Sequence, residues 1–203
     1  DHDEGLNTGG MGTVAPNPYY TPAVAERCMQ EIFLPTVAAM QAEGCPFKGC
    51  LYFGLMLTPD GPKVIEYNCR FGDPETQVVL PRLKTDLIDI LEAVREERLA
   101  ELPIEWSEDA CACVVMASGG YPAAYKKGLP IRGLDKQGQV PGAVVYHAGT
   151  KYENGCFYTN GGRVLGVTAA APTLDEALKK AYEAVGHIDF EGAHYRRDIG
   201  KTE

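Results

Sequence analysis

The stretch GCLYFGLMLTPDGPKVIEYNCRFGDPETQ, residues 49–77, decides the fold of the first half of this chain. It holds two apolar runs separated by the turn-rich segment TPDGP, a pattern that predicts a β-hairpin. Side chains alternate along a strand, so the second strand has two expected faces. One face carries Val64, Glu66 and Asn68, and the other carries Ile65, Tyr67 and Cys69.

The acidic residue in this second strand needs a partner, because burying an unpaired charge among apolar side chains is costly. Glu66 and Asn68 share a predicted face and offer neighbouring oxygen atoms, which suit a hard cation such as Mg²⁺. A half-exposed hairpin with one polar face explains the same spacing. The pattern alone leaves both interpretations open.

The residues that follow the hairpin are also candidates for a ligand site. Arg70 carries a planar five-donor fork that suits phosphate or carboxylate, and a surface salt bridge is the alternative interpretation. Asp73 and Glu75 flank Pro74, and this arrangement predicts the start of a helix as readily as a site.

The opening segment, residues 1–18, is rich in Gly, Asn and Pro and is predicted to be a loop. Within it, the glycine-rich segment consists of Asn7, Thr8, Gly9, Gly10, Met11 and Gly12. Its glycines would let backbone N–H groups approach an anionic ligand, and a plain turn is the alternative. The loop lacks the Gly-Lys-Ser/Thr ending of a P-loop and the G-x-G-x-x-G dinucleotide pattern.

Helices are expected in three places. The first begins at Pro22 with Thr21 as its N-cap, ends before Gly44, and should be kinked at Pro35, which removes one hydrogen bond. Its predicted inward residues are Met29, Ile32, Phe33, Val37 and Met40. The second runs from about Asp86 to Leu99, with Leu87, Ile90, Leu91 and Val94 inward. The third begins with a capping box of Thr173 and Glu176 and stops at Gly186.

The polar segment ELPIEWSED separates the second helix from a strand-rich region, so we predict domains 1–99 and 100–203. Strands are expected at ACACVVMAS, AVVYHAGTKY and GRVLGVTAAA. The predicted fold class is therefore α+β, with an antiparallel sheet and helices in the first part and a small α+β domain in the second.

Composition excludes several classes of partner. The net charge of −9 argues against broad binding of nucleic acid or an anionic membrane. No apolar run reaches the length needed to span a bilayer, and the opening residues lack a signal-peptide pattern, so a cytoplasmic location is expected. The seven cysteines form no C-x-x-C pair, and Cys111 and Cys113 are expected on one buried face of a strand rather than in a metal or redox site.

Several ordered motifs carry a resemblance to a known family. They are NTGGMG, VIEYNCRFGDPETQ, VVMASGGYP, HAGTK, TNGGRVL and RRDIG, and together they extend over nearly the whole chain. In these motifs the sequence resembles the second half of the phosphoribosylamine–glycine ligases, which are ATP-grasp enzymes. The resemblance implies that residues 1–99 form the second lobe of an ATP-grasp domain and that the rest is a C-terminal domain packed against it.

The implied reaction is a purine-biosynthetic, ATP-dependent ligation. Glycine carboxylate attacks the γ-phosphate of ATP to give glycyl phosphate, and the amine of 5-phosphoribosylamine then displaces phosphate, giving glycinamide ribonucleotide, ADP and phosphate. The implied cofactors are ATP and Mg²⁺ or Mn²⁺. The partner would be the N-terminal half of the same enzyme, without which this chain should be inactive.

The resemblance also assigns roles residue by residue. Glu66 and Asn68 match metal ligands, Arg70 matches the catalytic arginine beside the transferring phosphoryl group, and Met56, Ile65 and Glu66 match ATP contacts. The glycine-rich segment Asn7–Gly12, called the substrate loop from here on after this implied role, matches part of the glycine and ribose-phosphate pocket together with Asp73 and Glu75.

The sequence departs from the family pattern at two points. Many ATP-grasp enzymes carry a further metal-binding carboxylate about a dozen residues before the one matching Glu66, where this chain has LYFGLML. The family also has a basic stretch where His2 is here followed directly by Asp3, so a loop is expected to be missing at that point. Two alternatives to the ligase stay open: a non-catalytic binding module derived from the ATP-grasp fold, and a related carboxylate–amine ligase with another substrate.

Overall fold

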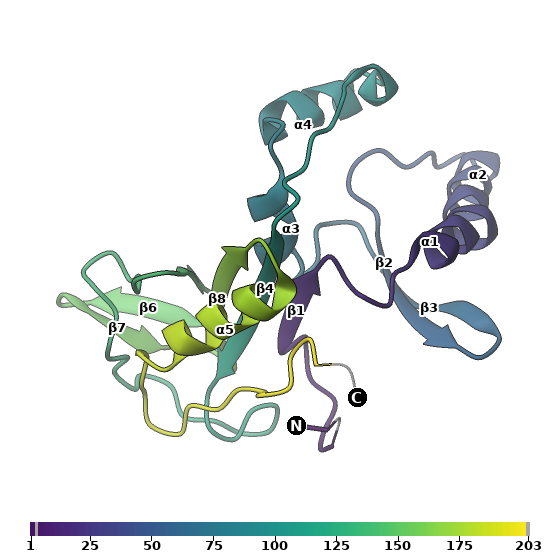
Figure 1. The fold of residues 1–203 in the computed structure, drawn as a ribbon. Helices are drawn as coiled ribbons and strands as arrows, with labels where there is room; N and C mark the ends of the chain where they lie inside the picture. Colours follow the sequence, from purple (N-terminus) through teal and green to yellow (C-terminus); the bar gives the residue numbers. More distant parts are fainter. Residues whose placement is uncertain (3, 202–203) are drawn as a thin grey trace. The chain divides into compact units, whose positions relative to one another are not determined.

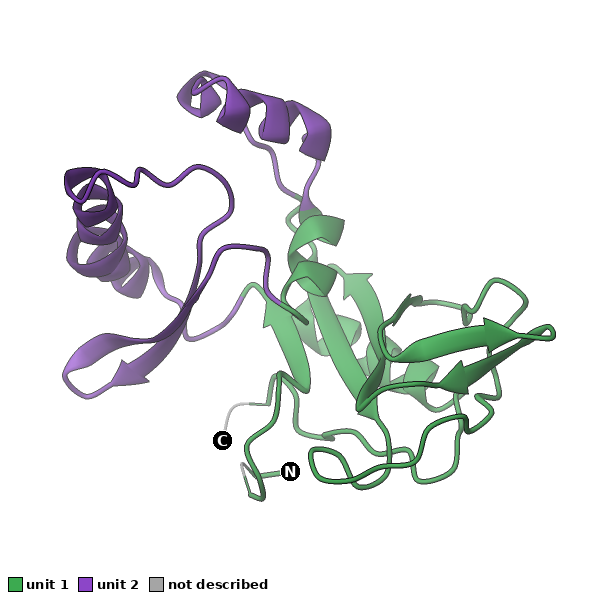
Figure 2. Ribbon diagram, turned by 180° about the vertical axis from the view of Figure 1, so that it is seen from behind, with its two compact units in different colours: residues 1–16, 73–82, 107–203 green, residues 17–72, 83–106 purple. Residues whose placement is uncertain are grey.

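The computed structural model describes residues 1–2 and 4–201, and these form two compact units (Figure 2). Unit 1 contains residues 1–16, 73–82 and 107–203, and unit 2 contains residues 17–72 and 83–106. The units alternate along the sequence, whereas the predicted domains 1–99 and 100–203 are consecutive segments, and that division stays a prediction. Asp3, where the missing loop was expected, lies outside the described residues.

Unit 1 is built on a four-stranded antiparallel sheet in the order β1-β4-β8-β5, of which Figure 1 labels β1, β4 and β8. Its strands are β1 (Gly12–Ala15), β4 (Ala110–Ala117), β5 (Val144–His147) and β8 (Arg163–Ala171). A separate hairpin of β6 (Thr150–Glu153) and β7 (Cys156–Thr159) extends from the connection between β5 and β8.

The central strand β4 is buried along its whole length because both of its faces are covered. Alternate residues from Ala110 to Met116 belong to the apolar clusters that contain residues of α5 (Leu174–Val185). The intervening Cys111, Cys113 and Val115 cluster with Val78 of the short helix α3 (Thr76–Val79). The prediction that the two cysteines share a buried face is thus confirmed.

The C-terminal helix α5 follows its sequence signals. Thr173 is the N-cap, and its hydroxyl accepts a hydrogen bond from the Glu176 amide at 3.3 Å. Four of its residues are buried against the sheet: Ala177, Ala181, Ala184 and Val185. Gly186 ends the helix as predicted.

Unit 2 begins with a helical segment of three parts: α1 (Pro22–Cys28), the π-helical turn η1 (Met29–Phe33) and α2 (Leu34–Ala42). Thr21 caps α1 by accepting a hydrogen bond from the Val24 amide at 3.3 Å. A kink was predicted at Pro35, whose nitrogen cannot donate a hydrogen bond. The irregular part of the helix is the π-helical turn, which ends directly before the pair Leu34-Pro35.

The remaining elements of unit 2 are the hairpin of β2 (Tyr52–Thr58) and β3 (Gly61–Asn68), the 3₁₀ turn η3 (Leu99–Glu101) and the helix α4 (Leu87–Arg95). The hairpin confirms the prediction from TPDGP. The Phe53 ring of β2 contacts Phe33 of the helical segment in a tilted arrangement and Tyr67 of β3 edge-on, with ring centroids 4.5 and 5.3 Å apart. One face of the hairpin therefore packs on that helical segment.

Several sequence predictions are wrong in detail. The opening segment is not all loop, because Gly12–Ala15 pairs with β4 as β1, and a four-residue strand shows too little pattern to be recognised without its partner. AVVYHAGTKY is not one strand but two, β5 and β6. Three predicted inward residues, Met29, Val37 and Leu91, are exposed, because in the described chain no element covers that side of their helices.

The structure also bears on the state of the cysteines, on membrane-spanning helices and on clusters of metal-binding side chains. All seven cysteines are free thiols, and burial raises the pKa of Cys111 to about 11 and that of Cys113 to about 12, so both thiols are protonated at neutral pH. Among the described residues, no helix is long and apolar enough to cross a membrane. In the same residues, no group of three or more His, Cys, Asp or Glu side chains could hold a metal ion.

Gly133 offers a test of the long connection between β4 and β5. Its φ of +87° is left-handed, and a Cβ there would overlap the His187 carbonyl oxygen. The two segments are held together next to this contact, because the backbones of Arg132 and Asp189 exchange two hydrogen bonds. Gly133→Ala should therefore cost about 1 kcal/mol of backbone strain plus roughly 1–3 kcal/mol of overlap. Gly128→Ala is the control, because Gly128 has a φ of +78° and open space around it. Equal losses of thermal stability in the two variants would contradict the prediction.

Candidate functional site

The β2–β3 hairpin contains a β-bulge that decides which side chains share a face. Gly54 pairs with Glu66 and Leu55 pairs with Val64, so Ile65 is the extra residue of β3. Val64 therefore lies on the same face as Leu55 rather than with Glu66, and the simple alternation expected from the sequence is wrong at this point. Glu66 and Asn68 still share a face, opposite Gly54 and Tyr52.

Glu66 and Asn68 converge on this face. The Asn68 side-chain amide donates a hydrogen bond of 3.1 Å to Glu66 Oε1. The glycine opposite Glu66 makes room for the carboxylate, because a Cβ on Gly54 would lie 2.7 Å from Glu66 Cγ. This hydrogen bond places the amide nitrogen of Asn68, rather than its carbonyl oxygen, next to the carboxylate. A carboxylate and an amide carbonyl oxygen are ligand types that Mg²⁺ or Mn²⁺ takes together with waters and phosphate oxygens.

The other predicted ligand residues of unit 2 lie on or just beyond the hairpin. Met56 is 54% exposed and Ile65 is 62% exposed, so both leave apolar surface accessible to a ligand. Met56 pairs with Lys63 and shares the face of Gly54. Because β3 ends at Asn68, Arg70 lies in the following bend, where its guanidinium donates to the Phe71 carbonyl at 2.8 Å.

In unit 1, the substrate loop is held tightly at its glycines. The Gly9 amide donates to the Tyr121 hydroxyl at 3.1 Å. A Cβ on Gly10 would lie 2.5 Å from Pro74 Cδ, and a Cβ on Gly12 would lie 2.5 Å from Ile199 Cδ1. The glycines are needed here because other segments pack directly on the backbone.

Arg163, at the start of β8, joins the substrate loop to the segment before α3. Its Nη1 donates to the Gly10 carbonyl at 3.1 Å and to the Asp73 carbonyl at 2.8 Å, and its Nη2 donates to Asp73 Oδ2 at 3.2 Å. The other carboxylate oxygen of Asp73 accepts from Gln77 Nε2 at 2.9 Å. Glu75 is the N-cap residue of α3, and its carbonyl accepts from the Val78 and Val79 amides.

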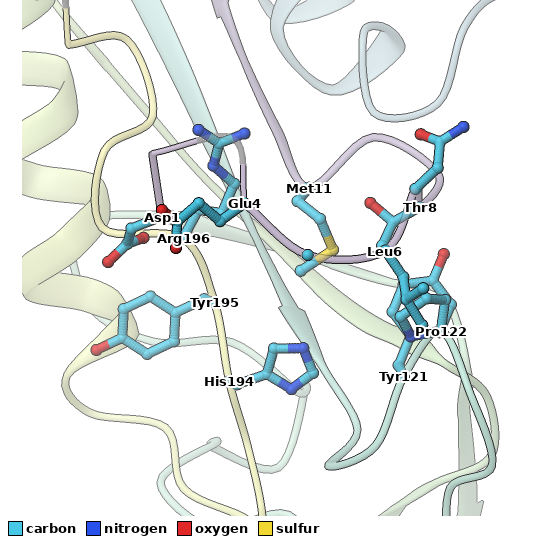
Figure 3. A pocket seen from close by; sticks show the side chains of 12 residues that line it. Asp1, Glu4, Leu6, Thr8, Met11, Tyr121, Pro122, His194, Tyr195 and Arg196 are labelled. Carbon is cyan, nitrogen blue, oxygen red and sulfur yellow. The ribbon is translucent and has the colours of Figure 1, made fainter.

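A pocket of about 580 Å³ lies beside the substrate loop. Residues from both ends of the chain line it: Asp1, Glu4, Gly5, Leu6, Asn7, Thr8, Met11, Tyr121, Pro122, His194, Tyr195 and Arg196. Figure 3 shows Arg196 on one side of the pocket and Tyr121 with Pro122 on the other, with Met11 and His194 between them. A guanidinium, an imidazole, the carboxylates of Asp1 and Glu4 and two polar side chains of the loop thus surround one space.

Arg196 is oriented by the neighbouring Asp198. The two side chains form a fork-to-fork pair, with Nε to Oδ1 at 2.8 Å and Nη2 to Oδ2 at 2.7 Å. Asp198 Oδ2 also accepts from the His2 amide at 2.8 Å, and Asp1 Oδ1 accepts from the Arg197 amide at 2.7 Å. These bonds tie the start of the chain to its end, and the hydrogen bond from Arg196 holds the pKa of the Asp198 carboxyl well below its usual range.

Comparison with known protein families identifies both parts of the chain. The family model described as "Phosphoribosylglycinamide synthetase, ATP-grasp (A) domain" matches residues 1–76. The model described as "Phosphoribosylglycinamide synthetase, C domain" matches residues 111–202. The chain belongs to the phosphoribosylglycinamide synthetase family.

Curated members of this family align along nearly the whole chain. The phosphoribosylamine–glycine ligase of Caldanaerobacter subterraneus is 50% identical over 199 residues, which are 98% of this chain and 47% of that protein. The ligase of Chlorobaculum tepidum is 52% identical over 198 residues, again 98% of this chain and 47% of that protein. The chain therefore spans about half the length of the curated relatives it matches.

Solved structures confirm the fold class. The crystal structure of phosphoribosylamine–glycine ligase from Thermotoga maritima matches 98% of this chain and 48% of that one, with a TM-score of 0.84 and 36% identity. The biotin carboxylase domain of Hydrogenobacter thermophilus 2-oxoglutarate carboxylase, solved with MgADP and bicarbonate, matches 91% of this chain and 40% of that one. Its TM-score of 0.58 at 15% identity shows a shared fold alone.

The structure brings only some of the predicted substrate residues to the pocket. Asn7, Thr8 and Met11 line it, whereas Gly9, Gly10, Gly12, Asp73 and Glu75 are not among its lining residues, and their roles stay predictions. Arg163, Tyr121 and Arg196 were not singled out, although each lies in a quoted family motif. Arg163 directly follows two glycines and precedes the apolar run VLGVTAAA. This position of a charged residue at the start of a buried strand is the signal that indicates a specific role for it.

The Arg196–Asp198 pair predicts a pH-dependent stability. A carboxyl whose pKa is depressed by folding contributes stability above its unfolded pKa of about 4 and loses it as the pH falls below that value. Asp198→Asn should therefore lower the free energy of unfolding by roughly 1–2 kcal/mol at neutral pH, with a difference from the wild type that shrinks below about pH 4. Urea unfolding at several pH values measures it, with the exposed turn variant Asp60→Asn as control. A pH-independent difference would contradict this assignment.

Proposed function

We propose that this chain supplies half of an enzyme that ligates glycine to 5-phosphoribosylamine at the expense of ATP. The reaction passes through glycyl phosphate and gives glycinamide ribonucleotide, ADP and phosphate, a step of purine biosynthesis. The observation that carries the proposal is the pairing of Glu66 with Asn68 on the hairpin face opposite the packed aromatic face, in a chain of this family.

The proposed role of Glu66 and Asn68 is to hold Mg²⁺ or Mn²⁺. Their donor atoms fit such a cation, since one carboxylate and one amide oxygen leave positions for water and for nucleotide phosphates. The bound cation would neutralise the phosphates of ATP. With no acid in LYFGLML, the cation would have few protein ligands in this part of the chain, so each one should matter.

The exposed apolar side chains of the hairpin have a proposed role in nucleotide binding. Met56 lies on the face of Glu66, and with Ile65 it offers apolar surface of the kind that binds a nucleobase. Arg70 follows the metal pair by two residues and is proposed to stabilise the charge on the transferring phosphoryl group.

The pocket beside the substrate loop is the proposed site for glycine and phosphoribosylamine. Each substrate carries an anionic group, the carboxylate of glycine and the phosphate of phosphoribosylamine, and Arg196, already oriented by Asp198, can donate to either. Asn7 and Thr8 add uncharged polar groups, and Asp73 and Glu75 are proposed to belong to the same substrate region. Such a site acts by positioning reactants rather than by covalent chemistry.

The proposed enzyme is completed by an N-terminal half. The chain covers 47% of the ligase from Caldanaerobacter subterraneus, so a complementary segment would provide the other lobe over the nucleotide. A cytoplasmic location stays a prediction. The rival proposal, a non-catalytic ATP-grasp-derived module, predicts binding of ATP without turnover, and a related ligase would turn over with another amine.

Replacing Glu66 tests the metal assignment in the full-length protein. Glu66→Gln keeps the shape and the hydrogen bond from Asn68 but removes the charge that neutralises the cation. We expect kcat to fall about 100-fold or more at limiting Mg²⁺, with partial recovery at high Mg²⁺ and an unchanged melting temperature. Steady-state assays across a Mg²⁺ titration measure this. The control Glu153→Gln changes an exposed strand glutamate of β6, and an equal effect there, or none at Glu66, would count against the assignment.

The proposal also predicts that these 203 residues alone do not turn over. Without a second lobe, charges directed at the phosphoryl group are screened by water, which weakens transition-state stabilisation. Glycine-dependent ADP release with phosphoribosylamine generated in place should be at least about 1000-fold slower than in the full-length protein. Comparable turnover would show that this chain holds a self-sufficient site.

A further inference from the structure

Arg163 contacts two segments that the proposed function assigns to substrate. We propose that Arg163 is a positioning residue that fixes the substrate loop and Asp73 relative to each other, and this inference rests on the proposed function. Three hydrogen bonds from one guanidinium carry it: two to the backbone carbonyls of Gly10 and Asp73, and one to the Asp73 carboxylate.

Only a guanidinium can make this set of bonds. Arginine presents its N–H groups in a rigid plane, so the two carbonyls and the carboxylate are satisfied at once, whereas an ammonium group is a single point of donation. The Arg163 side chain is only 24% exposed, and its carbonyl partners belong to backbone that no helix or strand ladder satisfies. Removing it would leave these acceptors without their donor.

The backbone that carries Arg163 is held in place by the sheet. This arginine is the first residue of β8, and the next two residues, Val164 and Leu165, are fully buried in the sheet. Ser118 fixes the turn before it, because its amide donates to the Gly162 carbonyl at 2.8 Å and its hydroxyl donates to the Gly161 carbonyl at 2.8 Å. The sheet core therefore sets the position of the guanidinium.

The loop backbone lies directly on this arginine. An ideal Cβ on Gly9 would be 3.3 Å from Arg163 Cζ, and the backbone of Gly10 packs on the buried ring of Pro74. Asn7, Thr8 and Met11, on either side of these glycines, line the pocket. A shift of Gly9 and Gly10 would therefore move the pocket lining, and misplacements near 1 Å can cost catalysis about 100-fold.

The test compares Arg163→Lys and Arg163→Met with Arg82→Lys and Arg82→Met. Arg82 is a matched control in unit 1, because its guanidinium also donates to two backbone carbonyls, those of Asp109 at 2.7 Å and Ser107 at 3.2 Å. In the full-length protein, Arg163→Met should lower kcat/KM for phosphoribosylamine about 100-fold and Arg163→Lys about tenfold, with an unchanged Kd for ATP. The Arg82 variants should alter thermal stability alone.

Hydrogen exchange on the full-length protein gives a readout independent of turnover. Amides of the substrate loop should exchange at least about tenfold faster in both Arg163 variants, while those of the β2–β3 hairpin stay unchanged. Faster loop exchange in a protein without ligase activity would refute the proposed function and leave loop anchoring in place. Normal kinetics in Arg163→Met, in an active ligase, would overturn the positioning role and leave the proposed function standing.

Discussion

The complete burial of β4 is the constraint on which unit 1 depends. A strand with no exposed residue must have both faces covered, and here α5 covers one face and α3 covers the other. The helix α3 is four residues long and could not persist alone in water, so its position comes from the sheet. Asp73 lies just before α3. Packing of α3 on the buried strand therefore also sets the position of this candidate substrate residue.

The same sheet determines the shape of the substrate loop. The loop continues into β1, which pairs with β4, and its glycines accept close contact from Pro74 and Ile199. Arg163 extends from the neighbouring strand β8 to the Gly10 carbonyl. A glycine-rich segment that would be mobile in isolation thus acquires one conformation, since partners from distant parts of the chain satisfy its backbone.

In unit 2, one inserted residue decides the chemistry of the hairpin. The bulge at Ile65 shifts Val64 onto the face of Leu55, the face that includes Phe53 and Tyr67. Glu66 and Asn68 are left on the opposite face with Met56, where the carboxylate avoids burial among aromatic rings. Glu66, Asn68 and Met56, which are proposed to bind one nucleotide and its metal ion, therefore lie on one surface, although strict alternation would have placed Val64 there too.

The sequence by itself determined the elements whose signals are local. The caps at Thr21 and Thr173, the hairpin turn at TPDGP and the shared face of Cys111 and Cys113 depend on neighbours within a few residues, and all were predicted. The close relation of Glu66 to Asn68 was predictable for the same reason.

Only the tertiary structure decided β1, the bulge at Ile65, the exposure of Leu91 and the roles of Arg163 and Arg196. Each of these depends on partners far away in the sequence: Arg163 is 153 residues from Gly10, and the His2 amide meets Asp198 across 196 residues. A local pattern records which residues favour a helix or a strand, but long-range pairing depends on which surfaces remain to be covered once those elements have formed.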